Sequence, residues 1–168
     1  MSELSRAVTA DWFLWTPLAA AVLHVFEEFV FPGGFLKWYR QYRGPAATGI
    51  TKSFLWKINA LLLAGCFNAG FVGHNPKNLW FWVLFAALLG SNGVWHAWAT
   101  VRSRAYSPGL ITGMLLYLPL ASISIGYCIM SGAMTPSAWF AAIIGALYPV
   151  WSAIFHHQRS TSMVDQGE

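Results

Sequence analysis

Three side chains within five residues carry the strongest chemical signal in this sequence. His24 is followed by Glu27 and Glu28, at spacings of three and four residues. On a helix, the positions three and four residues after His24 are rotated from it by about 60° and about 40°, in opposite directions, so the two carboxylates flank the imidazole. Because neighbouring carboxylates repel one another, either one is protonated or a cation holds them. The cluster therefore predicts a metal site or an acid–base pair.

A second polar pair, Asn92 and His96, has the i, i+4 spacing that places both side chains on one helical face. Both clusters lie inside long apolar runs. Glu28 is sixteen residues after Trp12, where its run begins, and His96 is seventeen residues after Leu79. If the two helices run in the same direction, the two clusters lie at nearly the same depth.

The match in depth predicts one shared site. We expect His96 to face the His24–Glu28 pair across the interface of the two helices, with Asn92 on the same face as His96 orienting it or adding a hydrogen bond. An unpaired carboxylate in hydrocarbon is too costly to retain, so Glu28 needs a partner from another helix. Close approach of the two helices is expected from two small residues, Ala20 and Gly93.

The elements that must position these residues are apolar segments. Of the 168 residues, 57% are hydrophobic and only 10% are charged, against roughly a quarter charged in soluble domains. This composition excludes a typical soluble enzyme and a disordered protein. We expect an all-α fold, a polytopic bundle of five transmembrane helices in a single domain, residues 1–168, with a flexible tail at 160–168. The predicted helices are near 12–31, 54–72, 79–98, 109–130 and 137–155, and Pro136 just before the last one suits a helix start.

The basic residues indicate the orientation of this bundle. The net charge is +4, but the cations form no patch with interleaved aromatics, so a nucleic acid partner is not expected. They gather in the loops on one side of the membrane, which the positive-inside rule assigns to the cytoplasm. We predict a protein of the cytoplasmic (inner) membrane with its N-terminus outside and its C-terminus inside. The inner set is Lys37, Arg40, Arg43, Lys52, Arg102, Arg104 and Arg159, and the outer set is Arg6 and Lys77.

Further polar groups are predicted near the depth of the His/Glu cluster, where they would bind a cofactor or substrate. They are Asn59, Tyr117 and Tyr148 within the helices and Tyr106 in a loop. Tyr106 opens the run Tyr-Ser-Pro-Gly, which is either a plain turn or an inner lid that reaches the site. The loop 33–53 is either an amphipathic segment on the membrane surface or an ordinary basic loop.

These motifs together resemble the HXXEE-domain family of small integral membrane proteins. His24-Val25-Phe26-Glu27-Glu28 is similar to its signature, His96 to its further histidine, and Tyr106–Gly109 to its Y-x-P-G motif. The resemblance implies a membrane protein with a metal or catalytic centre, and it implies no particular activity.

The residues favour a metal-dependent membrane enzyme that acts on a lipophilic substrate near the cytoplasmic side. His24, Glu27, Glu28 and His96 are the expected ligands of one transition metal ion, zinc, iron or manganese. The same four residues and Asn92 form the expected catalytic set. Which glutamate faces the centre stays open.

Other functions fit the same residues. The first is a metal-free acid–base isomerase or cyclase of a lipophilic substrate. The others are a proton- or ion-coupled transporter and a purely structural cluster. The expected partners are membrane lipid and a lipophilic small molecule, and homo-oligomerisation stays open.

Overall fold

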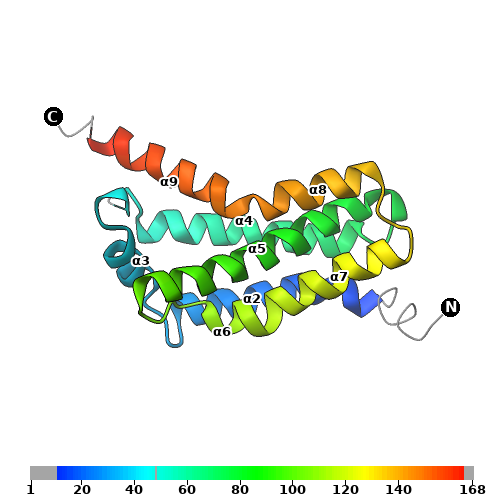
Figure 1. Ribbon diagram of the computed structural model, residues 1–168, viewed down its shortest axis with the longest axis horizontal. Helices are drawn as coiled ribbons and strands as arrows, with labels where there is room; N and C mark the ends of the chain where they lie inside the picture. Colours follow the sequence, from blue (N-terminus) through cyan, green and yellow to red (C-terminus); the bar gives the residue numbers. More distant parts are fainter. Residues whose placement is uncertain (1–10, 48, 165–168) are drawn as a thin grey trace.

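The structure is a computed structural model that describes residues 11–47 and 49–164, and this part of the chain is helical without strands. Its long helices lie side by side along one axis, with α5 in the middle of the bundle (Figure 1). In chain order the elements are η1 (Asp11–Trp15), α2 (Thr16–Phe29), α3 (Phe35–Arg43), η2 (Gly44–Ala47), α4 (Lys52–Val72), η3 (Pro76–Asn78), α5 (Leu79–Ser103), α6 (Leu110–Thr112), η4 (Gly113–Tyr117), α7 (Leu118–Met130), α8 (Pro136–Ala146) and α9 (Tyr148–Val164).

Three helical stretches are long and apolar enough to cross a membrane. They are Lys52–Val72, Pro76–Ser103 and Leu110–Met130, and the bent pair Pro136–Ala146 and Tyr148–Phe155 makes a fourth if it counts as one span. Helix α2 has only 14 residues, or roughly 21 Å at 1.5 Å per residue, against a hydrocarbon core of about 30 Å. The all-α fold is therefore confirmed, and of the five predicted spans three or four meet the length and apolarity of a span.

Prolines and capping threonines set several helix boundaries. The Thr51 hydroxyl accepts a hydrogen bond from the first turn of α4, and Thr135 does the same for α8. Helix α8 begins at Pro136, one residue before the predicted start. The predicted continuous helix 137–155 is instead bent by 48° between α8 and α9. Pro149 lies in the first turn after this bend, where its missing N–H is tolerated.

The basic segment 33–53 folds over one end of the bundle. Its helix α3 buries Phe35, Trp38 and Tyr39 and packs them against the indole of Trp95 on α5. This segment therefore contains an inward-packed helix, which neither sequence interpretation included. At the other end of the chain, α9 continues to Val164. The remaining residues of the predicted tail, 165–168, lie outside the described part.

Glycines let neighbouring helices approach α5 closely. A Cβ added at Gly93 would come within 2.6 Å of the carbonyl oxygen of Gly113 in η4. A Cβ at Gly145 of α8 would come within 2.4 Å of the carbonyl oxygen of Leu84. Gly93 thus serves contact with the segment after α6 and not, as predicted, contact with α2.

We predict that Gly93→Ala destabilises the bundle. The added methyl group collides with the backbone of Gly113, and overpacking of this kind costs about 1–3 kcal/mol. Gly126→Ala is the matched control, because a Cβ there meets nothing within 4 Å. Thermal unfolding of both variants in detergent tests this, and equal stability of the two would contradict the packing described here.

Candidate functional site

The two glutamates of α2 contact different neighbouring segments. Adjacent residues on a helix diverge by about 100°, and here Glu27 and Glu28 contact different partners. Both are buried, with exposed fractions of 5% and 6%, and His24 is fully buried between them and the bundle. Glu28 points toward α5 and Glu27 toward the segment that follows α5.

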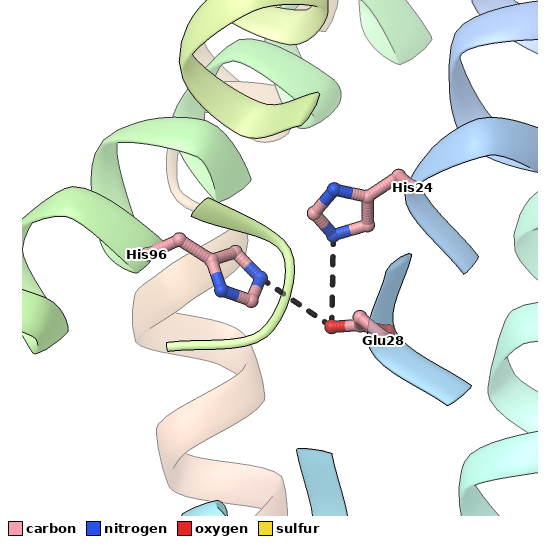
Figure 2. A group of neighbouring side chains, drawn as sticks. All are labelled: His24, Glu28 and His96. Atoms are coloured by element: carbon pink, nitrogen blue, oxygen red, sulfur yellow. Dashed lines mark ion pairs between the residues drawn. The ribbon is translucent and has the colours of Figure 1, made fainter. Parts of the chain in front are cut away.

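His24, Glu28 and His96 converge on one point. The Nε2 atom of His24 lies 3.6 Å from Oε1 of Glu28, and Nε2 of His96 lies 3.4 Å from the same oxygen. Figure 2 shows both imidazoles directed at this carboxylate. One ligand atom from each residue lies within 4.8 Å of the other two. The predicted proximity of His96 to the His24–Glu28 pair is confirmed.

Glu27 is held by the start of α6. Its oxygens accept hydrogen bonds from the backbone N–H of Gly109 at 3.0 Å, of Ile111 at 3.0 Å and of Thr112 at 2.7 Å. The Thr112 hydroxyl donates at 2.5 Å, and the Tyr106 hydroxyl donates as well. Five donors therefore surround the Glu27 carboxylate, which caps the N-terminus of α6.

The Tyr106 side chain lies in the connection between α5 and α6. Burial and the hydrogen bond to the Glu27 carboxylate raise the pKa of its phenol above the usual value. The hydroxyl therefore stays protonated and acts as a donor. Tyr106 contacts Glu27 and not the His24–Glu28–His96 group.

The Nδ1 atom of each imidazole, on the side of the ring away from Glu28, lies within hydrogen-bond distance of a hydroxyl. The Nδ1 atom of His24 lies 2.8 Å from the Thr112 hydroxyl. Since that hydroxyl gives its single proton to the Glu27 carboxylate, it accepts from His24, which places the proton on Nδ1 and leaves a lone pair on Nε2. Nδ1 of His96 lies 2.9 Å from the hydroxyl of Ser107.

Gly109 lies against both imidazoles. Its φ is +102°, and a Cβ there would come within 2.6 Å of Cε1 of His96 and 2.7 Å of Cε1 of His24. Only glycine fits, because any side chain would meet both rings and would also be strained by the positive φ. Tyr106, Ser107 and Gly109 thus all contact the site or its supports, so the motif is more than a plain turn, and its action as a lid stays a prediction.

Asn92 adds a hydrogen bond to the cluster, which is one of its two predicted roles, but its partner is His24 and it does not orient His96. Its Nδ2 atom donates to Nε2 of His24 at 3.2 Å. Tyr117 stacks on the same imidazole, with ring centroids 4.4 Å apart. The Tyr117 hydroxyl is buried and has no hydrogen-bond partner within the described ranges. Together with Thr112 and Glu28, these residues enclose His24, which is fully buried.

A cavity of about 280 Å³ opens beside the three-residue group. Glu28, Asn92 and His96 line it, and so do Asn59 and Tyr148 from α4 and α9. The rest of the wall is mainly apolar and aromatic. Of the four residues predicted to bind a cofactor or substrate, Asn59 and Tyr148 line this cavity, while Tyr106 and Tyr117 contact Glu27 and His24.

Sequence reasoning missed two residues of the site, Ser107 and Thr112. Each bonds Nδ1 of one histidine, and neither belongs to a spacing pattern that points to α2. Ser107 lies inside the Tyr-Ser-Pro-Gly run, which was the available signal. Thr112 is three residues after Gly109, in a segment interpreted only as apolar.

The fold and the site together define a helical protein with membrane-spanning candidates and a buried histidine–glutamate centre. A family model described as a protein of unknown function with HXXEE motif matches residues 15–124. The match covers more than half of the chain, so the chain belongs to the HXXEE family. Both site helices, α2 and α5, and the segment 106–112 lie within the matched region. No curated protein and no solved structure matches the chain.

We predict that the two adjacent glutamates respond differently to amide substitution. Glu27→Gln places an NH₂ group among five donors, and leaving buried donors unpaired costs about 1–3 kcal/mol each. Glu28→Gln keeps an oxygen and a donor beside two imidazoles and should cost less. Unfolding in detergent with a chelator present measures both. If Glu28→Gln lowers the free energy of unfolding as much as Glu27→Gln does, or more, then Glu27 does not hold α6.

Proposed function

We propose that this chain is an integral membrane protein in which His24, Glu28 and His96 hold one transition metal ion, and that it acts as a metal-dependent enzyme on a lipophilic substrate. The observation that carries the proposal is the convergence of both Nε2 atoms on one buried Glu28 oxygen, at 3.6 and 3.4 Å. These separations exceed the usual 2.7–3.2 Å of N–H···O bonds. They are close to the separation of roughly 3.3 Å between ligands about 2.0–2.1 Å from a tetrahedral metal.

The outer hydrogen bonds also suit a metal. Ligating histidines generally donate their other N–H to an oxygen, which fixes the tautomer and the orientation of the ring. His24 donates from Nδ1 to Thr112, which is itself bonded to Glu27. Ser107 is placed to accept from Nδ1 of His96 in the same way. Glu27 would therefore support the site through Thr112 and would not be a ligand itself.

Two imidazoles and one carboxylate are a donor set used for zinc in hydrolases and for non-haem iron in oxygenases. Three protein ligands leave a coordination position for water or substrate. The ion would supply Lewis acidity or an activated water. Imidazole ligands favour a transition metal over magnesium.

The cavity beside Glu28 and His96 supports a lipophilic substrate. Its wall combines apolar side chains such as Leu62 and Phe85 with the polar groups of Asn59 and Tyr148. A few placed polar groups in an apolar cavity are typical of small-molecule sites. Asn59 and Tyr148 would orient the substrate, while the apolar wall would exclude bulk water.

A second candidate function is metal-free acid–base chemistry, as in an isomerase. The donation from Asn92 to Nε2 of His24 favours it, because that bond occupies the lone pair a metal would need. His96 beside Glu28 would then form a proton-transfer pair. Metal content separates this function from the first.

We predict that the protein purified without a polyhistidine tag or chelator contains one transition metal ion per chain. His24→Ala, Glu28→Gln and His96→Ala should each lose the ion, because two ligands hold a metal far more weakly than three. The double variant with Glu28→Gln and His96→Ala should contain little less metal than either single variant.

His74→Ala is the control for this experiment, because His74 is exposed and far from the group in sequence. Elemental analysis of each variant gives the readout. Less than a tenth of an equivalent of zinc, iron and manganese in the parent protein would favour the acid–base function instead.

We also propose five membrane spans, with η1 and α2 forming the first and the bent pair α8–α9 the last. The basic residues on α3 and in the connection after α5 lie at one end of the bundle (Figure 1), and the positive-inside rule assigns this end to the cytoplasm. The orientation follows from this charge placement, with the N-terminus outside.

We predict opposite accessibility for single cysteines introduced at Ser2 and at Ser160. The native Cys66 and Cys128 are buried and should not react with a polar thiol reagent. In intact cells the reagent should label the first position only, and after permeabilisation both. Labelling of both positions in intact cells would contradict an odd number of spans.

A further inference from the structure

We propose that the groove between α7 and the α8–α9 pair, together with a cationic pocket at its end, binds one anionic phospholipid. The site lies outside the metal centre and does not depend on a metal. It consists of an apolar part that fits acyl chain and a polar part that fits a phosphate group.

The apolar part is a groove of about 1040 Å³ over the face of α5. Small residues such as Gly90, Ala121 and Ala142 line it, and a Cβ added at Gly90 of α5 would come within 2.5 Å of the Cβ of Ala121. Val94 and Ile143 line it with exposed fractions of 53% and 54%. The groove therefore offers apolar surface that lipid chains would cover in a membrane.

The polar part is a pocket of about 490 Å³ lined by Arg43 and Arg102, with Gln41, Tyr42 and Ser103. No acidic residue lines it. The Nε atom of Arg43 is buried without a hydrogen-bond partner in the described part of the chain. Two guanidinium groups without a carboxylate nearby are a fitting set of donors for a phosphate.

Arg43 joins the two parts, because it lines both the groove and the pocket. A ligand that uses both must be apolar along most of its length and anionic at one end. Trp98, beside Arg43 in the groove, is half exposed, as expected for an aromatic residue at the membrane interface. The pocket lies at the basic end of the bundle, where anionic lipids of the cytoplasmic leaflet would meet it.

The groove also lies next to the candidate metal centre. Trp95 and Pro149 line both the groove and the cavity that holds Glu28 and His96. The bend between α8 and α9 places Pro149 in this shared wall. These two residues therefore form part of the wall between a lipid in the groove and the cavity.

The experiment measures binding of dioleoyl phosphatidic acid and dioleoyl phosphatidylcholine to the full chain in detergent, by native mass spectrometry. We expect the anionic lipid to bind at least fivefold more tightly. Arg102→Gln and Arg43→Gln should each weaken it about fivefold, since each cation near a lipid surface contributes on the order of 1 kcal/mol. Arg102 is exposed, so its replacement should not affect folding.

Lys37→Gln is the matched control, because it removes one charge from α3 at an exposed position that lines neither pocket. Gly126→Leu should weaken both lipids by filling the groove, whereas Ala60→Leu on the exposed face of α4 should not. Equal binding of the two lipids, or equal effects of Arg102→Gln and Lys37→Gln, would overturn the proposal. So would a lipid-free dimer that Gly126→Leu dissociates, because a second copy would then occupy the groove.

Discussion

The burial of the Glu27 carboxylate is the interaction on which the site depends. A carboxylate inside an apolar bundle is stable only when donors surround it, and α2 has no donors of its own to offer. The start of α6 supplies them, from residues 82 to 85 positions later in the chain. Meeting this need brings Ser107, Gly109 and Thr112 against the two imidazoles. The same contact that satisfies Glu27 therefore orients His24 and His96.

The meeting of His24, Glu28 and His96 was predictable because it follows from spacing and depth alone. Asn92 was expected to orient His96 or to add a hydrogen bond, and the same spacing argument identifies its actual partner. Asn92 precedes His96 by one turn just as His24 precedes Glu28, and α2 and α5 run in the same direction (Figure 1). Partners in such a pair of helices match level by level, so Asn92 meets His24. Ser107 and Thr112 were not predictable, because their positions depend on how a loop folds back.

The positions of the long helices were largely predictable, since an apolar run of about 20 residues is typical of a helix that can span a membrane. The departures occur at prolines and in the basic loop. Pro149 lies inside the predicted helix 137–155, and the bend accompanies it. Before Pro119 the helix forms the π turn η4, in which the N–H of Leu118 bonds the carbonyl of Gly113. These prolines were visible in the sequence, whereas the inward packing of α3 depends on its tertiary partners.

The distance in sequence between Glu27 and its donors has a consequence for biosynthesis. Gly109 is polymerised 82 residues after Glu27, which takes roughly 4–16 s at about 5–20 residues per second. Throughout that interval Glu27 on α2 has none of these donors, although Glu28 has His24 one turn before it. At 14 residues, α2 is also short for a membrane span. Each unpaired carboxylate at the centre of a membrane opposes insertion by about 2.5–3.5 kcal/mol. Helix α2 therefore reaches its final packing only after the segment that encloses Glu27 has been made.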